Sequence, residues 1–172
     1  GSHDILKLLM LYIHKAHRIR IAYVAAALAA VLLVVGLFRW IMQPAHAYFS
    51  TDFVMVVDTT KPGNADNLFT IPIFGGGYNY NVDCDNDGVI EATNRTAAYT
   101  CTYATPGTYT IAISGNFPRI YFFNQPNSRE KIMEVKQWGG QVWTTMQHAF
   151  RGASNVRITA TDAPNLSAVT NM

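Results

Sequence analysis

Apolar and polar residues alternate over three segments in the middle of the chain. Residues 78–84 place Tyr, Tyr, Val and Cys on one face and Asn, Asn and Asp on the other. The same alternation returns at residues 99–103 and 109–113. A period of two is typical of strands with one buried face. Together with the short apolar runs at 53–57 and 68–74, these segments predict a mainly β fold built as a small sandwich.

A continuous apolar run precedes the predicted strands. Residues 21–38 form 18 consecutive positions without a charged side chain. A helix needs about 17–25 apolar residues to span a bilayer, so this run predicts a transmembrane helix. Residues 44–47 read Pro-Ala-His-Ala, which equally fits the cleavage end of a secretory signal. Both interpretations export the residues that follow. A third, a helix buried in a soluble domain, would need a large core around it.

Charge divides at the same place along the chain. Residues 1–39 carry five Lys or Arg and one Asp, which is 5 − 1 = +4. The remaining residues carry eight Lys or Arg and ten Asp or Glu, which is 8 − 10 = −2. Basic residues before an apolar run predict a cytoplasmic N-terminus. The summed charge therefore gives no reason to expect nucleic acid as a partner. We expect residues 1–47 to hold a tag scar (Gly-Ser-His), a basic region and the transmembrane or signal helix.

A weak repeat replaces the alternation after residue 118. The triplets at 144–146 and 170–172 lie 26 residues apart, and Ile132 and Ile158 share that spacing. A period of 26 falls within the range of leucine-rich-type repeats. The helical spacing of apolar residues over 146–150 predicts a short helix in the first unit.

These patterns predict how the exported part is organised. We expect a sandwich over residues 48–118 and the start of leucine-rich-type repeats over 119–172. Within that segment the predicted helix would pack on a strand near 155–159. A solenoid needs about three repeats to be stable, so we expect either that the array is cut short at the end of the chain or that the sandwich acts as an N-terminal cap for a very short array.

Both cysteines, Cys84 and Cys101, fall on the inward face of their predicted strands. If those strands face each other, a disulfide is geometrically possible, and outside the cytoplasm it would be oxidised. Closing a loop of about 17 residues would contribute roughly 3 kcal/mol. The alternative is a pair of buried free thiols.

The loop after residue 82 carries acidic side chains at alternate positions: Asp83, Asp85 and Asp87. A glycine follows, as in the opening of a calcium-binding loop, and Glu91 stands at its ninth position. The twelfth position is Asn94, which is no bidentate carboxylate, and no flanking helix is expected. Ca²⁺ bound by the three aspartates and Glu91 therefore competes with a second interpretation, in which these residues shape a turn through side-chain hydrogen bonds.

Aromatic residues are dense between residues 119 and 150, which predicts a partner-binding surface. Its expected members are Tyr121, Phe123, Trp138 and Trp143. Aromatic residues beside a repeat are also common in cores, so a core role is the alternative. No nucleophile motif or metal spacing of histidines occurs, and we therefore predict no catalytic residue, no enzyme activity and no cofactor other than Ca²⁺.

The segment "AAYTCTYATPGTYTIAI" (97–113) resembles the closing signature of PKD-like, immunoglobulin-like sandwiches, and "YNYNVDCDNDG" (78–88) is similar to the Asp-rich strand of the same family. Cys84 stands where that family usually has Trp, and Cys101 where it often has His, a paired departure that fits a disulfide.

Adding "GNFPRIYF", "WTTMQHAFRGASN" and "ITATDAPNLSAVTNM", residues 53–172 resemble bacterial BspA-like leucine-rich-repeat surface proteins. The resemblance implies a non-catalytic adhesion or binding module that meets a protein or host-surface ligand, with membrane contact through residues 21–38 if the helix is retained. The alternatives are a calcium-binding accessory module of a secreted enzyme and a structural surface spacer.

Overall fold

The computed structural model describes residues 7, 10, 49 and 51–172, and the predicted membrane or signal helix at 21–38 lies outside the described residues. No helix with the length and hydropathy of a membrane span occurs among the residues described. Residues 51–172 belong to one compact unit.

Residues 51–172 are mainly β, as the alternation predicts, and contain no helix. The strands are β1 (Phe53–Asp58), β2 (Leu68–Ile71), β3 (Asn79–Asp83), β4 (Ala92–Arg95), β5 (Tyr99–Thr102), β6 (Thr108–Asn116), β7 (Ile132–Gln137) and β8 (Arg157–Ile158). β2 ends just before Pro72, because proline has no N–H to donate to a strand ladder.

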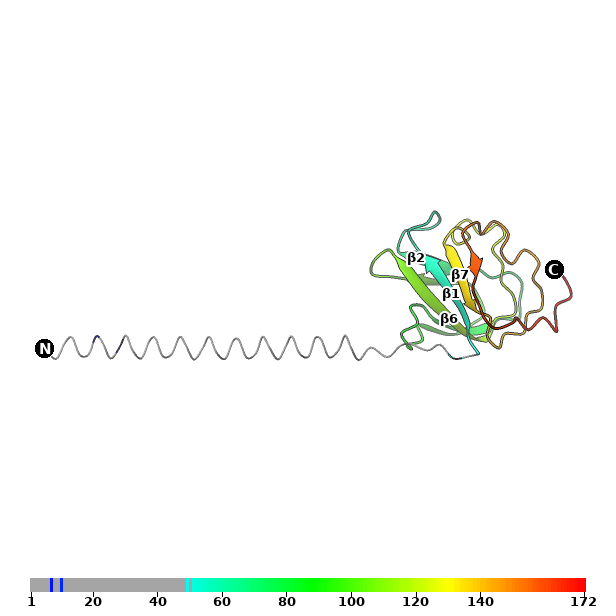
Figure 1. Cartoon of the computed structure of the whole chain (residues 1–172), viewed down its shortest axis with the longest axis horizontal. Coiled ribbons are helices and arrows are strands. Elements are labelled where there is room, and N and C mark those ends of the chain that lie inside the picture. Colours follow the sequence, from blue (N-terminus) through cyan, green and yellow to red (C-terminus); the bar gives the residue numbers. More distant parts are fainter. Residues whose placement is uncertain (1–6, 8–9, 11–48, 50) are drawn as a thin grey trace. The chain divides into compact units, whose positions relative to one another are not determined.

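The strands form a six-stranded sheet in the order β4-β3-β6-β1-β7-β8 and a two-stranded sheet of β2 and β5. β1 lies between β6 and β7, which Figure 1 shows in cyan, green and yellow. β1 pairs antiparallel with β6, placing Phe53 opposite Ile113. All pairings in the large sheet are antiparallel except β7 with β8, which is parallel.

One core cluster takes side chains from both sheets, consistent with a β-sandwich. The predicted inward positions of residues 78–84 are all buried: Tyr78, Tyr80, Val82 and Cys84. They meet Phe69 and Ile71, which project from β2 of the small sheet. Full burial of a side chain such as Phe or Ile contributes about 1.5–3 kcal/mol, so the alternation accounts for much of the fold's stability.

Residues after 118 extend this same core. β7 is hydrogen-bonded to β1, so the predicted sandwich and the predicted repeat segment share one sheet. Trp138 and Trp143 both pack on Phe53, with ring centroids 6.2 and 5.3 Å away. The boundary expected at residue 118 therefore does not separate two compact units.

The short helix predicted over 146–150 is wrong. Residues 147–152 form a turn, in which the Ala149 N–H donates to the Met146 carbonyl at 3.0 Å. His148 has φ 60°, a left-handed conformation that an α-helix cannot include. The strand expected near 155–159 is present as β8.

Lys131 holds the small sheet to the rest of the unit. Its side chain is fully buried, and its Nζ donates to the carbonyls of Asn64, Ala65 and Leu68 at 3.0, 2.9 and 3.0 Å. Burial lowers the pKa of this ammonium, which the charges of nearby aspartates oppose. The three carbonyls replace its lost hydration and fix the loop before β2.

Candidate functional site: an acidic loop beside a disulfide

The candidate site begins where β3 ends, at a disulfide between the two sheets. The sulfurs of Cys84 and Cys101 lie 1.95 Å apart and the Cα atoms 5.8 Å apart. Cys101 belongs to β5 of the small sheet, so the bond ties that sheet to the end of β3. Both cysteines are buried, as their inward positions predict.

The loop after the disulfide is shaped by aspartate side chains. Asp83 accepts the N–H of Asp87 on one carboxylate oxygen at 3.2 Å and the N–H of Gly88 on the other at 2.9 Å. Asp87 in turn accepts the N–H of Val89 at 2.8 Å. Gly88 has φ 87°, which a residue with a side chain rarely adopts. The turn-forming interpretation of these aspartates is therefore confirmed.

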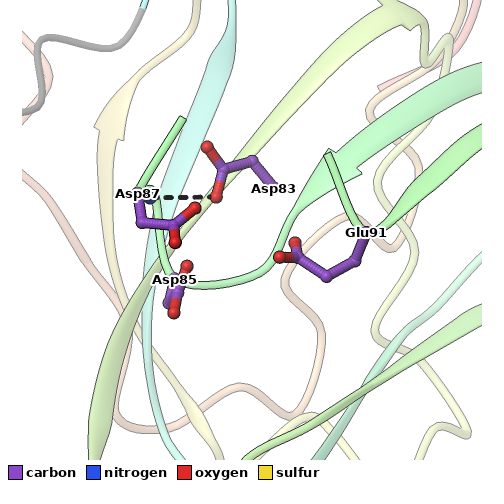
Figure 2. Close-up of side chains that lie close together, drawn as sticks. All are labelled: Asp83, Asp85, Asp87 and Glu91. Carbon is purple, nitrogen blue, oxygen red and sulfur yellow. Dashed lines mark hydrogen bonds between the residues drawn. The ribbon is translucent and has the colours of Figure 1, made fainter. Parts of the chain in front are cut away.

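Glu91 closes the loop back toward β3. Its Oε2 accepts the N–H of Cys84 at 2.6 Å, and its own N–H donates to the Val82 carbonyl at 2.9 Å. The four predicted residues, Asp83, Asp85, Asp87 and Glu91, each place a carboxylate oxygen within 4.8 Å of the others. Figure 2 shows the four side chains around the loop. Asp83 is buried and the other three are exposed.

Negative charge is crowded in this loop. Although Asp85 is exposed to solvent, partial desolvation by the loop raises the pKa of its carboxyl, and the neighbouring charges of Asp87 and Asp83 raise it further. Burial raises the pKa of Asp52 too, and the charge of Asp83 contributes. A group of four carboxylates can bind a metal ion, and an all-oxygen set suits Ca²⁺, Mg²⁺ or Mn²⁺ rather than zinc. The turn and the metal-binding interpretations are therefore compatible with each other.

Tyr103 lies directly against the loop. Its hydroxyl donates to the Cys84 carbonyl at 2.7 Å, and its ring stacks on Tyr109. Burial raises its pKa, with smaller contributions from the charges of Asp85 and Glu91. Tyr103 can therefore serve as an intrinsic fluorescence probe close to the four carboxylates.

The predicted aromatic surface is wrong for three of its four members. Trp143, Trp138 and Tyr121 are 0%, 6% and 7% exposed. The two tryptophans belong to the core, which was the alternative interpretation. Phe123 is half-buried and packs on His148 at 4.8 Å between ring centroids.

Three residues that the sequence analysis did not identify pack against the aromatic residues around Tyr121 and Phe123. Arg119 and Arg151 lie over aromatic rings, and Phe74 stacks on Tyr121. They come from three separate segments, so no spacing along the chain could have grouped them. A lone arginine in an aromatic-rich stretch, such as Arg119 in "FPRIYFF", was the one available signal.

No family model, no curated protein and no solved structure matches the chain.

Proposed function

We propose that the chain is an exported, non-catalytic surface module that binds a protein or a host-surface ligand. The disulfide between the sheets is the observation that carries this proposal. Disulfides persist in oxidising compartments and are rare in the cytoplasm. The apolar run at 21–38, as a membrane anchor or a signal, supplies the means of export.

The proposed relationship to BspA-like proteins draws support from the parallel pairings after residue 130. Glu134 pairs with Arg157 and Val142 bridges Asn165, each in parallel. The separations are 157 − 134 = 23 and 165 − 142 = 23 residues. Coils of leucine-rich-type repeats stack in parallel with periods of about 20–29 residues, so two successive coils of such a repeat fit these residues.

The state of the cysteines in the producing cell tests export. The chain is isolated from its own cells under acid, alkylated and weighed by mass spectrometry. We expect a mass lower than that of the dithiol form by two hydrogen atoms and no alkylation of Cys84 or Cys101. Complete alkylation of both thiols would contradict an exported protein.

Cell adhesion tests the binding role itself. Surfaces coated with the full oxidised chain should retain host cells above the level of albumin-coated surfaces. The Cys84→Ala/Cys101→Ala variant, coated at equal density, is the matched control for a weakened fold. Equal retention on the protein and on albumin would favour the structural spacer instead.

A second candidate is calcium binding at the acidic loop, and the four converging carboxylates favour it. Calcium takes six to eight oxygen ligands. The four side chains supply several of them, and water can complete the set. Desolvation is the main cause of the raised pKa of Asp85, and a bound divalent cation would offset the repulsion from Asp87 and Asp83 that adds to it. In this proposal the ion stiffens the loop and the disulfide-linked strand end.

Terbium luminescence tests this site, because Tyr103 can transfer excitation to a bound lanthanide. We expect emission that calcium displaces and that Asp85→Asn weakens. Asp66→Asn, which removes an exposed carboxylate elsewhere, is the control. At a calcium concentration 100 times the Kd, stability should rise by about 2.7 kcal/mol, or roughly 10 °C in Tm.

The direction in which Asp85→Asn changes Tm in the absence of calcium provides an independent check. A carboxyl whose folded pKa is raised lowers stability as pH rises through that pKa. The amide should therefore raise Tm at pH 7 in chelator while it reduces the gain from calcium. An unchanged Tm with calcium, together with no terbium emission, would rule out the metal.

A further inference from the structure

Arginine and aromatic side chains alternate across one surface formed by three segments. The arginine–aromatic surface comprises Phe74, Arg119, Phe123, His148 and Arg151, which lie around the buried ring of Tyr121. Phe74 follows β2, residues 119–123 lie between β6 and β7, and residues 148–151 belong to the turn that replaces the predicted helix.

Arg119 lies against a stacked pair of rings. Its Cζ lies 4.8 Å from the centroid of Phe74 and 4.7 Å from that of Tyr121, and those two rings stack at 4.5 Å. One terminal nitrogen donates to the Gln147 carbonyl at 3.4 Å, whereas Nε is buried without a partner. The rings fix the plane of the guanidinium and leave donors on its other arm unused.

Arg151 repeats this arrangement at the other end of the surface. Its Cζ lies 4.2 Å from the centroid of Phe123, which packs on the His148 ring at 4.8 Å. The ion pairs found among residues 51–172 are Lys61 with Asp58 and Arg129 with Glu130, and neither involves Arg119 or Arg151. Two guanidinium groups without a carboxylate partner thus occur in a region, residues 40–172, whose net charge is −2.

We infer that this surface binds an acidic glycan through its sulfate or carboxylate groups. This inference deepens the proposed binding role and rests on it, since it names the class of host-surface ligand. A guanidinium recognises such an oxyanion with two parallel hydrogen bonds, and its planar fork is already oriented by the rings. Phe74, which is 53% exposed, offers an apolar contact to the C–H face of a sugar.

The geometry favours a glycan over other polyanions. Single-stranded nucleic acid is bound mainly by free aromatic faces on which bases stack. Here guanidinium groups already cover faces of Phe74, Tyr121 and Phe123. Clusters of arginine also recognise acidic peptides, and the polyglutamate arm of the test below separates that ligand from a glycan. An acidic glycan has repeated anionic groups and small apolar faces. These features match two separated arginines beside an exposed aromatic ring.

The test titrates heparin, as a sulfated glycan, into the full chain in a non-ionic detergent. We expect Arg119→Gln/Arg151→Gln to weaken the affinity about tenfold or more, since two charge-assisted contacts are lost. Arg95→Gln is the matched control, because Arg95 also lies over a ring, Tyr99, at 5.4 Å but outside this surface. The heparin affinity of the Arg95→Gln variant should stay within about twofold of that of the unmodified chain, a difference in binding free energy below 0.5 kcal/mol.

Two further arms check the chemistry. Arg119→Lys/Arg151→Lys keeps the charge but not the planar fork, so we expect an intermediate loss in a protein whose unfolding midpoint is unchanged. Desulfated heparin, which keeps only its carboxylates, should bind more weakly, and raising the salt concentration should weaken binding of the sulfated form. Polyglutamate and a single-stranded oligonucleotide should bind more weakly than heparin at equal charge concentration.

Unchanged heparin affinity in the glutamine double variant would overturn the inference, as would an equal loss in Arg95→Gln. An unchanged heparin affinity in the lysine double variant would show that positive charge alone is sufficient. It would refute the proposed role of the guanidinium geometry. Equal binding of polyglutamate or of the oligonucleotide would refute the glycan assignment. If the double variant still retains host cells on coated surfaces, the proposed adhesion role stands and only the glycan inference fails.

Discussion

Removing the disulfide is the most direct test of how the two sheets are held together. The bond closes a loop with a sequence separation of 17 residues. In the chain-entropy model, opening such a loop costs about 3 kcal/mol. In the variant Cys84→Ala/Cys101→Ala, each lost buried sulfur removes about another 1 kcal/mol of packing. We therefore expect the double alanine variant to lose about 3–5 kcal/mol, which corresponds to a Tm lower by at least 10 °C.

Urea unfolding of the full chain, followed by tryptophan fluorescence, measures this loss. The unmodified protein in reductant should move to nearly the midpoint of the double alanine variant, and the variant itself should not respond to reductant. The slope of the free energy against urea should rise in both cases, because the open chain exposes more surface when unfolded. A loss below about 1 kcal/mol, with both thiols shown to be free, would refute the cross-link as a main support of the sandwich.

Substitutions at three other residues probe the rest of the unit, each by urea unfolding. Trp143→Ala should cost about 3–5 kcal/mol because it empties a fully buried site, whereas Trp143→Phe should cost much less, since the buried indole N–H has no hydrogen-bond partner. Lys131→Met keeps the apolar stem but leaves three carbonyls without a donor; we expect a loss of about 3 kcal/mol and faster proteolysis of residues 61–67. Burial raises the pKa of Tyr80 to about 12, so stability should fall as pH rises from 10 to 12, and Tyr80→Phe should lessen that fall.

Much of the sandwich could be predicted because strand alternation is a local signal. Each inward position of residues 78–84 is set by its immediate neighbours, and parity alone placed Cys84 and Cys101 on buried faces. The acidic loop was predictable for the same reason, since its four acidic residues lie within nine positions, from 83 to 91. The one departure is Asp83, a polar-face position that is buried because its carboxylate accepts two N–H groups of its own loop.

What could not be predicted depends on contacts between distant residues. The pairing of β1 with β7 joins residues about 80 positions apart, and no periodicity signals it. The sequence therefore predicts that the tryptophans near residue 140 are part of a binding surface, although they pack in the core against Phe53 and Phe117. The missing helix at 146–150 is a local failure of another kind, because a single histidine in a left-handed conformation reverses the chain there.

The contacts between β7 and the segment after it show how residues 119–172 are joined to the sandwich. Asp162 accepts the N–H groups of Trp138 and Gly139 on its carboxylate, which anchors the later segment to the end of β7. Gly139 lies so close to the start of β1 that a Cβ there would approach the Asp52 carbonyl oxygen to 2.2 Å. The start of β1, the end of β7 and the loop at 162 are thus locked at one point. A chain cut at residue 118 would lose β7 from beside β1 and expose Phe53, so neither the acidic loop nor the arginine–aromatic surface should survive on the isolated halves.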